Sequence, residues 1–193
     1  MDRYKIVKLT FIALLMIAAA GFLHKNLPRT AVVQITGTDV KRIDKSIKKN
    51  TDDQKKKPEA AAVSTQDVRY INALTAENEA MVFRNEDTGW GWPPYFKFNS
   101  ADVTAEAQAF ATAQERPWVL VKYYGWRIRM FSMFPNVISL KEVDKDYTHI
   151  PYFNIIFVSL LVILIFFVRR KIQQLVEWVK GLSVFQRFKT KSA

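Results

Sequence analysis

The sequence contains no cysteine and only two histidines among its 193 residues. The absence of cysteine excludes disulfide bonds and thiol chemistry, so a domain outside the cytoplasm would depend on its hydrophobic core. The two histidines, His24 and His149, lie at the edges of the region between two long apolar runs. That region therefore lacks the usual residues of Ser-His-Asp, Cys-His and zinc sites, and we expect no metal or other cofactor.

Acidic residues are also few, since 18 Asp and Glu stand against 29 Lys and Arg, for a net charge of +11. By region, the excess is +2 over the first eight residues, +6 after Val168 and only +3 over residues 24–150. A nucleic-acid-binding domain would carry the charge on the domain itself, so no nucleic-acid partner is expected. Basic residues just outside apolar runs instead follow the positive-inside rule and predict two cytoplasmic tails.

Two runs are apolar enough to cross a bilayer. Residues 6–23 are interrupted by Lys8 alone, and residues 150–168, IPYFNIIFVSLLVILIFFV, contain no charge. Each run is long enough to cross a hydrocarbon core about 30 Å thick as a helix. The first run also has the layout of a secretory signal with an A-x-A cleavage pattern at residues 18–20. We favour an uncleaved anchor, because the apolar residues continue to Leu23.

These features predict a membrane protein with five parts. The parts are a cytoplasmic tail (1–5), a transmembrane helix or signal anchor (6–23), an exported β-rich domain (24–149), a transmembrane helix (150–168) and a basic amphipathic cytoplasmic tail (169–193). Within the exported domain, residues 45–65 have many charges and few large apolar side chains, which predicts a flexible linker. The last tail has apolar residues at helical spacing, so we expect it to continue the span or to lie on the inner membrane surface, with Gly181 interrupting a long helix.

The exported domain has the pattern of five strands and one helix. Segments rich in β-branched and aromatic residues predict strands over residues 30–40, 67–74, 80–87, 118–128 and 136–143. The first of these strands is expected to end in a turn at Gly-Thr-Asp. Apolar residues spaced i, i+4, i+7 and i+8 from Val103 predict a helix that Asn99 or Ser100 caps and that ends near Gln114.

The predicted fold class is α+β and membrane-anchored. The order β-β-β-α-β-β is that of a small five-stranded barrel of the OB type. A ferredoxin-like or other α+β sandwich is the alternative, because element order does not fix strand pairing.

Several motifs in this region resemble a known family. They are VVQITGTDVKRID, DVRYINA, VFRNEDTGWGWPPYFKFNSADVTAEAQ and YYGWRIRMFSMFPNVISLK, followed by IPYFNIIF at the second apolar run. Together they are similar to the bacterial membrane-protein family catalogued as domain of unknown function 1523, over nearly all of residues 27–168. The resemblance implies a bacterial envelope protein with an exported domain between two spans, and with the charge pattern we expect an inner-membrane protein whose domain is periplasmic. It implies no activity.

The segment RNEDTGWGWPPYFKFNS, residues 84–100, combines polar side chains with five aromatic rings. Its rings could stack on a sugar or base, or rest at the outer bilayer interface. We favour a third interpretation, in which they cap the core, because buried aromatic residues commonly carry the core of a small domain. The candidate ligand- or partner-binding residues are Arg84, Glu86, Asp87, Trp90, Trp92, Tyr95, Trp126 and Arg127.

The charged candidates predict surface pairing more readily than catalysis. Arg127 and Arg129 lie two apart on a predicted strand, so they would share one face and could pair with Glu86 or Asp87. Glu86 and Asp87 are a poor catalytic pair, because neighbouring strand residues point to opposite faces whereas a glycosidase needs two carboxyl groups across one sugar.

We therefore expect a non-enzymatic protein whose exported domain binds or scaffolds an envelope ligand or partner. The expected partners are the lipid bilayer and an envelope protein or a second copy of the chain. One alternative is an enzyme that acts on envelope glycan or lipid through Glu86 or Asp87. A second alternative is an oligonucleotide-binding module of the OB type.

Overall fold

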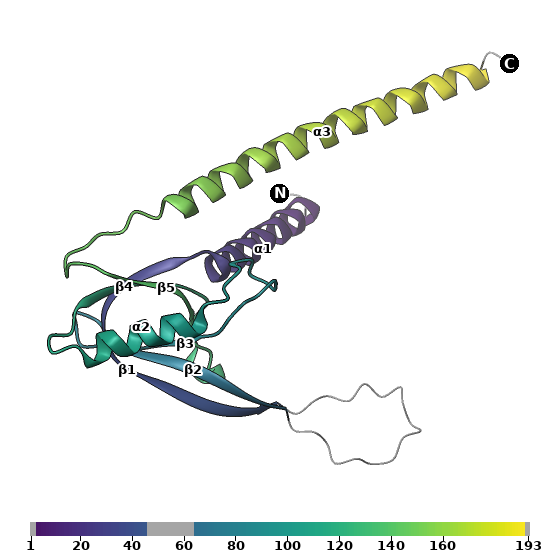
Figure 1. Ribbon diagram of the computed structural model, residues 1–193. Helices are drawn as coiled ribbons and strands as arrows, with labels where there is room; N and C mark the ends of the chain where they lie inside the picture. The colour runs from purple at the N-terminus through teal and green to yellow at the C-terminus, as the bar shows by residue number, and fades with distance from the viewer. Residues whose placement is uncertain (1–2, 46–63, 192–193) are drawn as a thin grey trace, which may run out of the picture. The chain divides into compact units, whose positions relative to one another are not determined.

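The computed structural model describes the backbone of residues 3–45 and 64–191, and the side chains of residues 3–42 and 67–178. The chain forms two compact units, Met1–His149 and Ile150–Ala193. The first unit contains helix α1 (Arg3–Asn26), five strands and helix α2 (Ser100–Thr112), and the second contains helix α3 (Tyr152–Lys191) (Figure 1).

The five strands close into a barrel in the order β1-β2-β3-β5-β4, and β4 pairs with β1 to complete it. They are β1 (Arg29–Lys45), β2 (Ser64–Leu74), β3 (Ala80–Asn85), β4 (Trp118–Tyr124) and β5 (Asn136–Glu142). Neighbouring strands are antiparallel, except β3 and β5, which run parallel and meet at Arg84 and Asn136. The predicted five-stranded barrel, with one helix between the third and fourth strands, is confirmed.

Alternate residues of the strands fill the barrel, as expected from the two-residue period of a β-strand. Helix α2 links β3 to β4 and adds Val103 and Ala107 to the same core. Burial of one large aliphatic or aromatic side chain contributes roughly 1.5–3 kcal/mol, so this core can support a domain without disulfides. The core consists of Val33, Ile35, Ile71, Ala73, Phe83, Val103, Ala107, Val119, Val121 and Val137.

Strand β1 is longer than the sequence pattern predicts. The turn expected at Gly37–Asp39 is wrong, because the strand continues through these residues to Lys45. Pairing with β2 explains the continuation, since Asp39 accepts a hydrogen bond of 2.6 Å from Asn72 Nδ2 on that strand. The linker predicted at 45–65 lies almost entirely outside the described residues.

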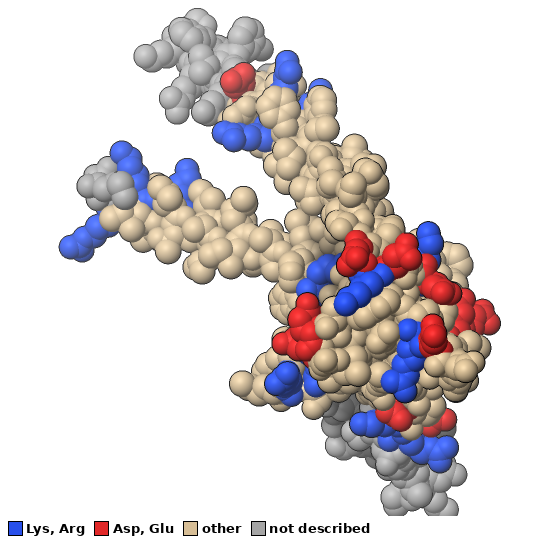
Figure 2. Space-filling model, turned by 90° about the vertical axis from the view of Figure 1, so that its left-hand side faces the viewer, with Lys and Arg blue, Asp and Glu red and all other residues tan. Residues whose placement is uncertain are grey.

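Both terminal helices are long and apolar. Helix α1 and the part of α3 from Tyr152 to Trp178 each have a mean hydropathy of 2.4 over their most apolar stretch, and neither stretch is buried. By length and composition alone, either helix could cross a membrane. Figure 2 shows the uncharged middle of both helices, with basic side chains gathered toward one end of each. Helix α3 continues through residue 181 to Lys191, so the interruption expected at Gly181 is wrong.

Candidate functional site

Two tryptophans from different barrel loops hold the last turns of α1. Trp92, in the β3–α2 loop, stacks on Phe22 with ring centroids 5.9 Å apart and donates its indole N–H to Asn26 Oδ1 at 3.0 Å. Trp126, in the β4–β5 loop, donates its indole N–H to His24 Nδ1 at 2.8 Å. The end of α1 is thus gripped on two sides, and we call this pair of contacts the tryptophan clasp.

Further contacts complete the junction. The backbone N–H of Gly125 donates to the carbonyl oxygen of Lys25 at 2.9 Å, and the Tyr95 hydroxyl donates to the carbonyl oxygen of Asn26. The edge of the Trp126 ring lies 3.8 Å from the Cβ position of Gly21, so it packs directly on the helix surface. The orphan carbonyl groups at the C-terminus of α1 therefore find partners in the barrel.

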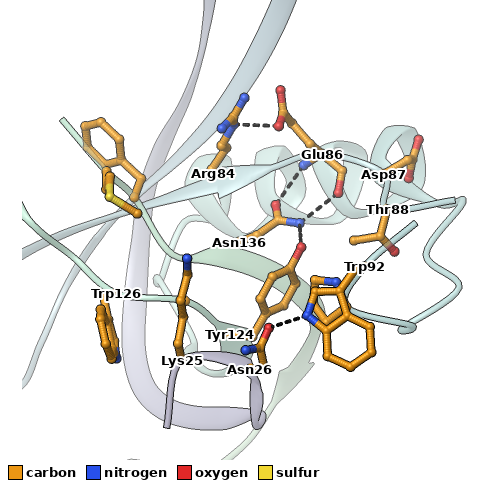
Figure 3. A pocket seen from close by; sticks show the side chains of 14 residues that line it. Lys25, Asn26, Arg84, Glu86, Asp87, Thr88, Trp92, Tyr124, Trp126 and Asn136 are labelled. Atoms are coloured by element: carbon orange, nitrogen blue, oxygen red, sulfur yellow. Dashed lines mark hydrogen bonds and ion pairs between the residues drawn. The ribbon is translucent and has the colours of Figure 1, made fainter. Parts of the chain in front are cut away.

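A cleft of about 420 Å³ lies at this junction (Figure 3). Three parts of the chain form it: the last turn of α1, the end of β3 with the loop that follows, and the β4–β5 loop. In Figure 3 the amino group of Lys25 points into the cleft. The walls carry both signs of charge and four aromatic rings, from Lys25, Arg84, Glu86, Asp87, Trp92, Tyr124, Trp126 and Phe134.

Asn136 ties the end of β3 to the start of β5 at one wall of the cleft. Its side-chain oxygen accepts the backbone N–H of Glu86 and its side-chain nitrogen donates to the Glu86 carbonyl oxygen, both at 2.9 Å. The same nitrogen donates to the Tyr124 hydroxyl at 2.9 Å. Burial raises the pKa of the Tyr124 hydroxyl, so this group stays neutral at ordinary pH. Glu86 Oε2 forms an ion pair with Arg84 Nε at 2.6 Å.

Asp87 caps helix α2 from the preceding loop. Its Oδ1 accepts the backbone N–H of Ser100 at 2.9 Å, and its Oδ2 accepts the Ser100 hydroxyl at 2.7 Å. The expected capping by Asn99 or Ser100 is wrong: Asn99 occupies the cap position without a side-chain bond, and Ser100 itself is bonded to Asp87. A carboxylate at a helix N-terminus is favourable because it satisfies a free N–H and complements the helix dipole.

Lys97 is buried, with 4% of its surface exposed. Its amino group donates to the Val137 carbonyl oxygen at 2.6 Å and to the side-chain oxygen of Asn85. Burial lowers the pKa of Lys97 to about 8, against the opposing effect of Asp87. Asn85 in turn donates to the Ser100 carbonyl oxygen at 2.8 Å. The network fastens the β3–α2 loop to β3, β5 and α2, which fixes the wall of the cleft.

The aromatic rings of the β3–α2 loop do not cap the core, so the favoured interpretation was wrong. Tyr95 and Lys97 turn inward, and Tyr95 stacks on Tyr124 with centroids 4.8 Å apart. Trp90, Trp92, Phe96 and Phe98 are exposed instead, and none of them belongs to the buried core. The exposed fractions are 85% for Trp90, 68% for Trp92, 54% for Phe96 and 58% for Phe98.

The structure brings most of the predicted binding residues to the cleft. Those that line it are Arg84, Glu86, Asp87, Trp92 and Trp126. Trp90 lies outside the cleft in the exposed part of its loop, and Tyr95 contacts α1 through its hydroxyl.

Arg127 also lies outside the cleft, because β4 ends at Tyr124 and the chain turns into a loop. Its guanidinium lies 4.0 Å from the centre of the Phe134 ring and donates to the Met133 carbonyl oxygen at 3.0 Å. The expected strand face shared by Arg127 and Arg129 is therefore wrong. Glu86 pairs with Arg84 instead.

Five of the fourteen lining residues were among the predicted binding residues, and those that sequence reasoning missed include Lys25, Asn26 and Asn136. Lys25 and Asn26 follow an apolar run, and polar residues at that position indicate only the end of a helix. Asn136 directly follows a proline at the start of a strand. A polar residue at that position is the one feature of the sequence that could have indicated its hydrogen-bonding role.

The volume of the cleft falls within the roughly 300–1,000 Å³ typical of ligand pockets. Among the side chains that the structure describes, residues 3–42 and 67–178, no three His, Asp or Glu gather as possible metal ligands.

Fold and site together define a small five-stranded barrel that one long apolar helix precedes in the chain and another follows, with a polar and aromatic cleft where the first helix joins the barrel. The family model described as Protein of unknown function (DUF1523) matches residues 4–176, and the chain belongs to this family. An uncharacterized protein of Haemophilus influenzae is 45% identical over 121 residues, which are 63% of this chain and 65% of the relative, just under two thirds of its length. No solved structure matches the chain.

Proposed function

We propose that α1 and α3 anchor this protein in a bacterial inner membrane and that the barrel lies at the periplasmic surface of this membrane. The cleft binds an envelope ligand there, without catalysis. The observation that carries the proposal is the tryptophan clasp. It joins the end of an apolar helix to the barrel and forms part of the cleft wall.

The dimensions of α1 support the anchoring. Its 24 residues span about 36 Å at roughly 1.5 Å per residue, which exceeds a hydrocarbon core of about 30 Å. The apolar run ends at Leu23, so His24, Lys25 and Asn26 would lie among the headgroups. Tryptophan is enriched at that depth, and both clasp tryptophans contact this part of the helix.

The orientation follows from charge. The basic residues of the first eight positions and of the segment after Val168 favour the cytoplasm for both ends. Alkaline phosphatase fused after Asp144 should be active in cells, and a cytoplasmic reporter fused there should be silent. The reverse pattern would refute the exported position of the barrel.

The chemistry of the cleft favours a saccharide or a lipid headgroup as the ligand. Flat rings of Trp92 and Trp126 can stack on a sugar, while the amino group of Lys25 can meet an anionic substituent. The barrel connectivity agrees, because barrels of the OB type bind oligosaccharides as well as oligonucleotides. The charge of +3 over residues 24–150 favours the saccharide over the nucleic acid.

Glu86 and Asp87 serve structure in this site. Asp87 caps α2 with both carboxylate oxygens, and Glu86 pairs with Arg84 while its backbone pairs with Asn136. A general acid would need its carboxyl group available to the substrate. The proposal therefore gives these two residues positioning roles.

Site-specific photocrosslinking in native membranes tests the binding. A benzophenone amino acid at Met133, which lines the cleft, should capture a lipid or glycan adduct detected by mass spectrometry. The same group at Met130, which is 86% exposed on the same loop but outside the cleft, is the matched control. The Met133 adduct should disappear when Trp126→Ala is added. Equal labelling at both positions, or none at Met133, would count against a ligand in the cleft.

A further inference from the structure

The β3–α2 loop carries three aromatic rings that the barrel leaves uncovered. The Trp90 ring lies edge-on to Phe96 and to Phe98, with centroids 5.4 and 5.8 Å away. We call these three residues the outer aromatic cluster. More than half of each side chain is exposed, so the rings gather on one another without entering the core. A contiguous aromatic surface of this kind marks contact with an apolar partner.

The loop is built to hold Phe96 outward. Phe96 has φ 48°, a left-handed conformation that bulky residues rarely adopt. The flanking residues keep it there: Tyr95 stacks on Tyr124, and the backbone of Lys97 bonds to the Thr88 hydroxyl and to the N–H of Gly89, both at 3.1 Å. Strained backbone of this type persists where surrounding contacts fix it, and it concentrates at functional positions.

The same loop sets the position of the cluster along α1. Trp92 lies two residues from Trp90, and it stacks on Phe22 within the apolar run while it bonds to Asn26 at the helix end. A loop fixed at these two points lies at the level where α1 leaves the hydrocarbon core. Aromatic side chains concentrate at this level of a bilayer.

We infer that the outer aromatic cluster inserts into the outer interface of the bilayer that α1 crosses. The inference rests on the proposed function only through the span of α1. The cluster gives the barrel a second membrane contact beside the helix, which fixes its rotation about the helix axis. The cleft, on the same loop, is then held facing the lipid headgroups.

Single nitroxide labels can measure this contact, because the natural chain has no cysteine to compete for the label. Trp90→Cys, Phe96→Cys and Phe98→Cys are made in the full chain and reconstituted in vesicles of phosphatidylethanolamine and phosphatidylglycerol. Electron paramagnetic resonance then compares collisions with oxygen, which enters the bilayer, and with a water-soluble nickel chelate. Circular dichroism in the same vesicles shows that each variant is folded.

Two reference labels make the outcome decisive. Glu77→Cys lies in the exposed β2–β3 turn, at the opposite end of β3 from the cleft, about 17 Å away at roughly 3.3 Å per residue. Leu14→Cys lies in the middle of α1 and reports whether this helix spans the bilayer.

The cluster labels should show a severalfold higher ratio of oxygen to nickel collisions than Glu77→Cys, and a lower ratio than Leu14→Cys. Cluster labels as open to nickel as Glu77→Cys, with Leu14→Cys in the bilayer, would overturn the insertion and leave the anchoring in place. A Leu14→Cys label open to nickel would overturn the anchoring and the insertion together.

Discussion

Trp126 donates its indole N–H to His24 Nδ1 across 2.8 Å, although 102 residues separate the two in the chain. His24 belongs to an apolar helix and Trp126 to a barrel loop, so this bond makes the helix end part of the domain. Lys25 and Asn26, the next two residues, line the cleft. Movement of α1 relative to the barrel would therefore change the cleft directly, because the last turn of the helix forms one wall of it.

Trp126→Phe removes the indole N–H and keeps an aromatic ring. We expect the free energy of unfolding of the barrel, measured by urea titration in detergent, to fall by about 1 kcal/mol, since one hydrogen bond contributes roughly 0.5–1.5 kcal/mol. In a double-mutant cycle, Trp126→Phe and His24→Ala should couple by an amount of that size. Trp118→Phe is the control, because it makes the same change at a ring of β4 that contacts the amino group of Lys145. The losses of stability from Trp118→Phe and His24→Ala should be additive. Equal coupling in the two cycles would contradict a specific bond.

Asp87→Ala removes the cap of α2. Loss of both bonds to Ser100 should lower the free energy of unfolding by roughly 0.5–2 kcal/mol, the usual cost of losing an N-terminal cap. Asp102→Ala is the matched control, because it removes an exposed carboxylate from the first turn of the same helix. We expect it to cost roughly 0.3–1 kcal/mol, through the helix dipole alone. If Asp102→Ala lowered the free energy of unfolding as much as Asp87→Ala, the effect would come from the negative charge near the helix end and not from a specific cap.

Much of the fold was readable from local patterns. Enrichment in β-branched and aromatic residues predicted the strands, and the spacing of apolar residues from Val103 predicted α2. The extension of β1 to Lys45 was not readable, because it depends on pairing with β2, and strand pairing is a nonlocal contact. The same applies to the cap of α2, which comes from Asp87 in another element.

The candidate site was predictable in composition and unpredictable in arrangement. Aromatic and charged residues near Trp92 marked the right loop, but no local pattern indicated that α1 would supply Lys25 and Asn26, because their place in the cleft depends on contacts far apart in the chain. The rings of this loop were expected to be buried, because apolar side chains usually face a core. Phe96 and its aromatic neighbours are exposed instead.

Lys97 gives the barrel a stability that depends on pH. Its pKa is about 8 in the folded protein, below the ordinary value of 10.5, because burial disfavours the charged form. Between these two values the unfolded chain binds more protons than the folded one, so this residue makes stability rise with pH from about 8 to 10.5. The full gain is on the order of 3 kcal/mol, at about 1.4 kcal/mol per unit of pKa.

Urea titrations at several pH values, with wild type and Lys97→Met compared, measure this effect. Lys97→Met should lack the rise above pH 8, while Lys122→Met, on the half-buried part of β4, should keep it. A rise of the same size in Lys97→Met would assign the pH dependence to another group.

Phe96→Gly separates the stability of the barrel from its membrane contact. Glycine adopts φ 48° freely, so the change removes a backbone strain of about 1–2 kcal/mol. It also removes the edge contact with Trp90, which contributes roughly 0.5–1.5 kcal/mol. We expect the free energy of unfolding in detergent to be unchanged or slightly higher.

Phe98→Gly is the matched control, because Phe98 also contacts Trp90 but its φ is not positive. This variant should lose roughly 1–2.5 kcal/mol, because it loses its own edge contact with Trp90 and glycine also adds flexibility to the unfolded chain. A loss in Phe96→Gly as large as that in Phe98→Gly would mean that the backbone at Phe96 stores no strain. A different outcome would support the membrane contact: Phe96→Gly keeps its stability, and a nitroxide at Trp90→Cys in that variant becomes more accessible to the nickel chelate. The strained backbone at Phe96 would then serve the contact with the bilayer and not the stability of the barrel.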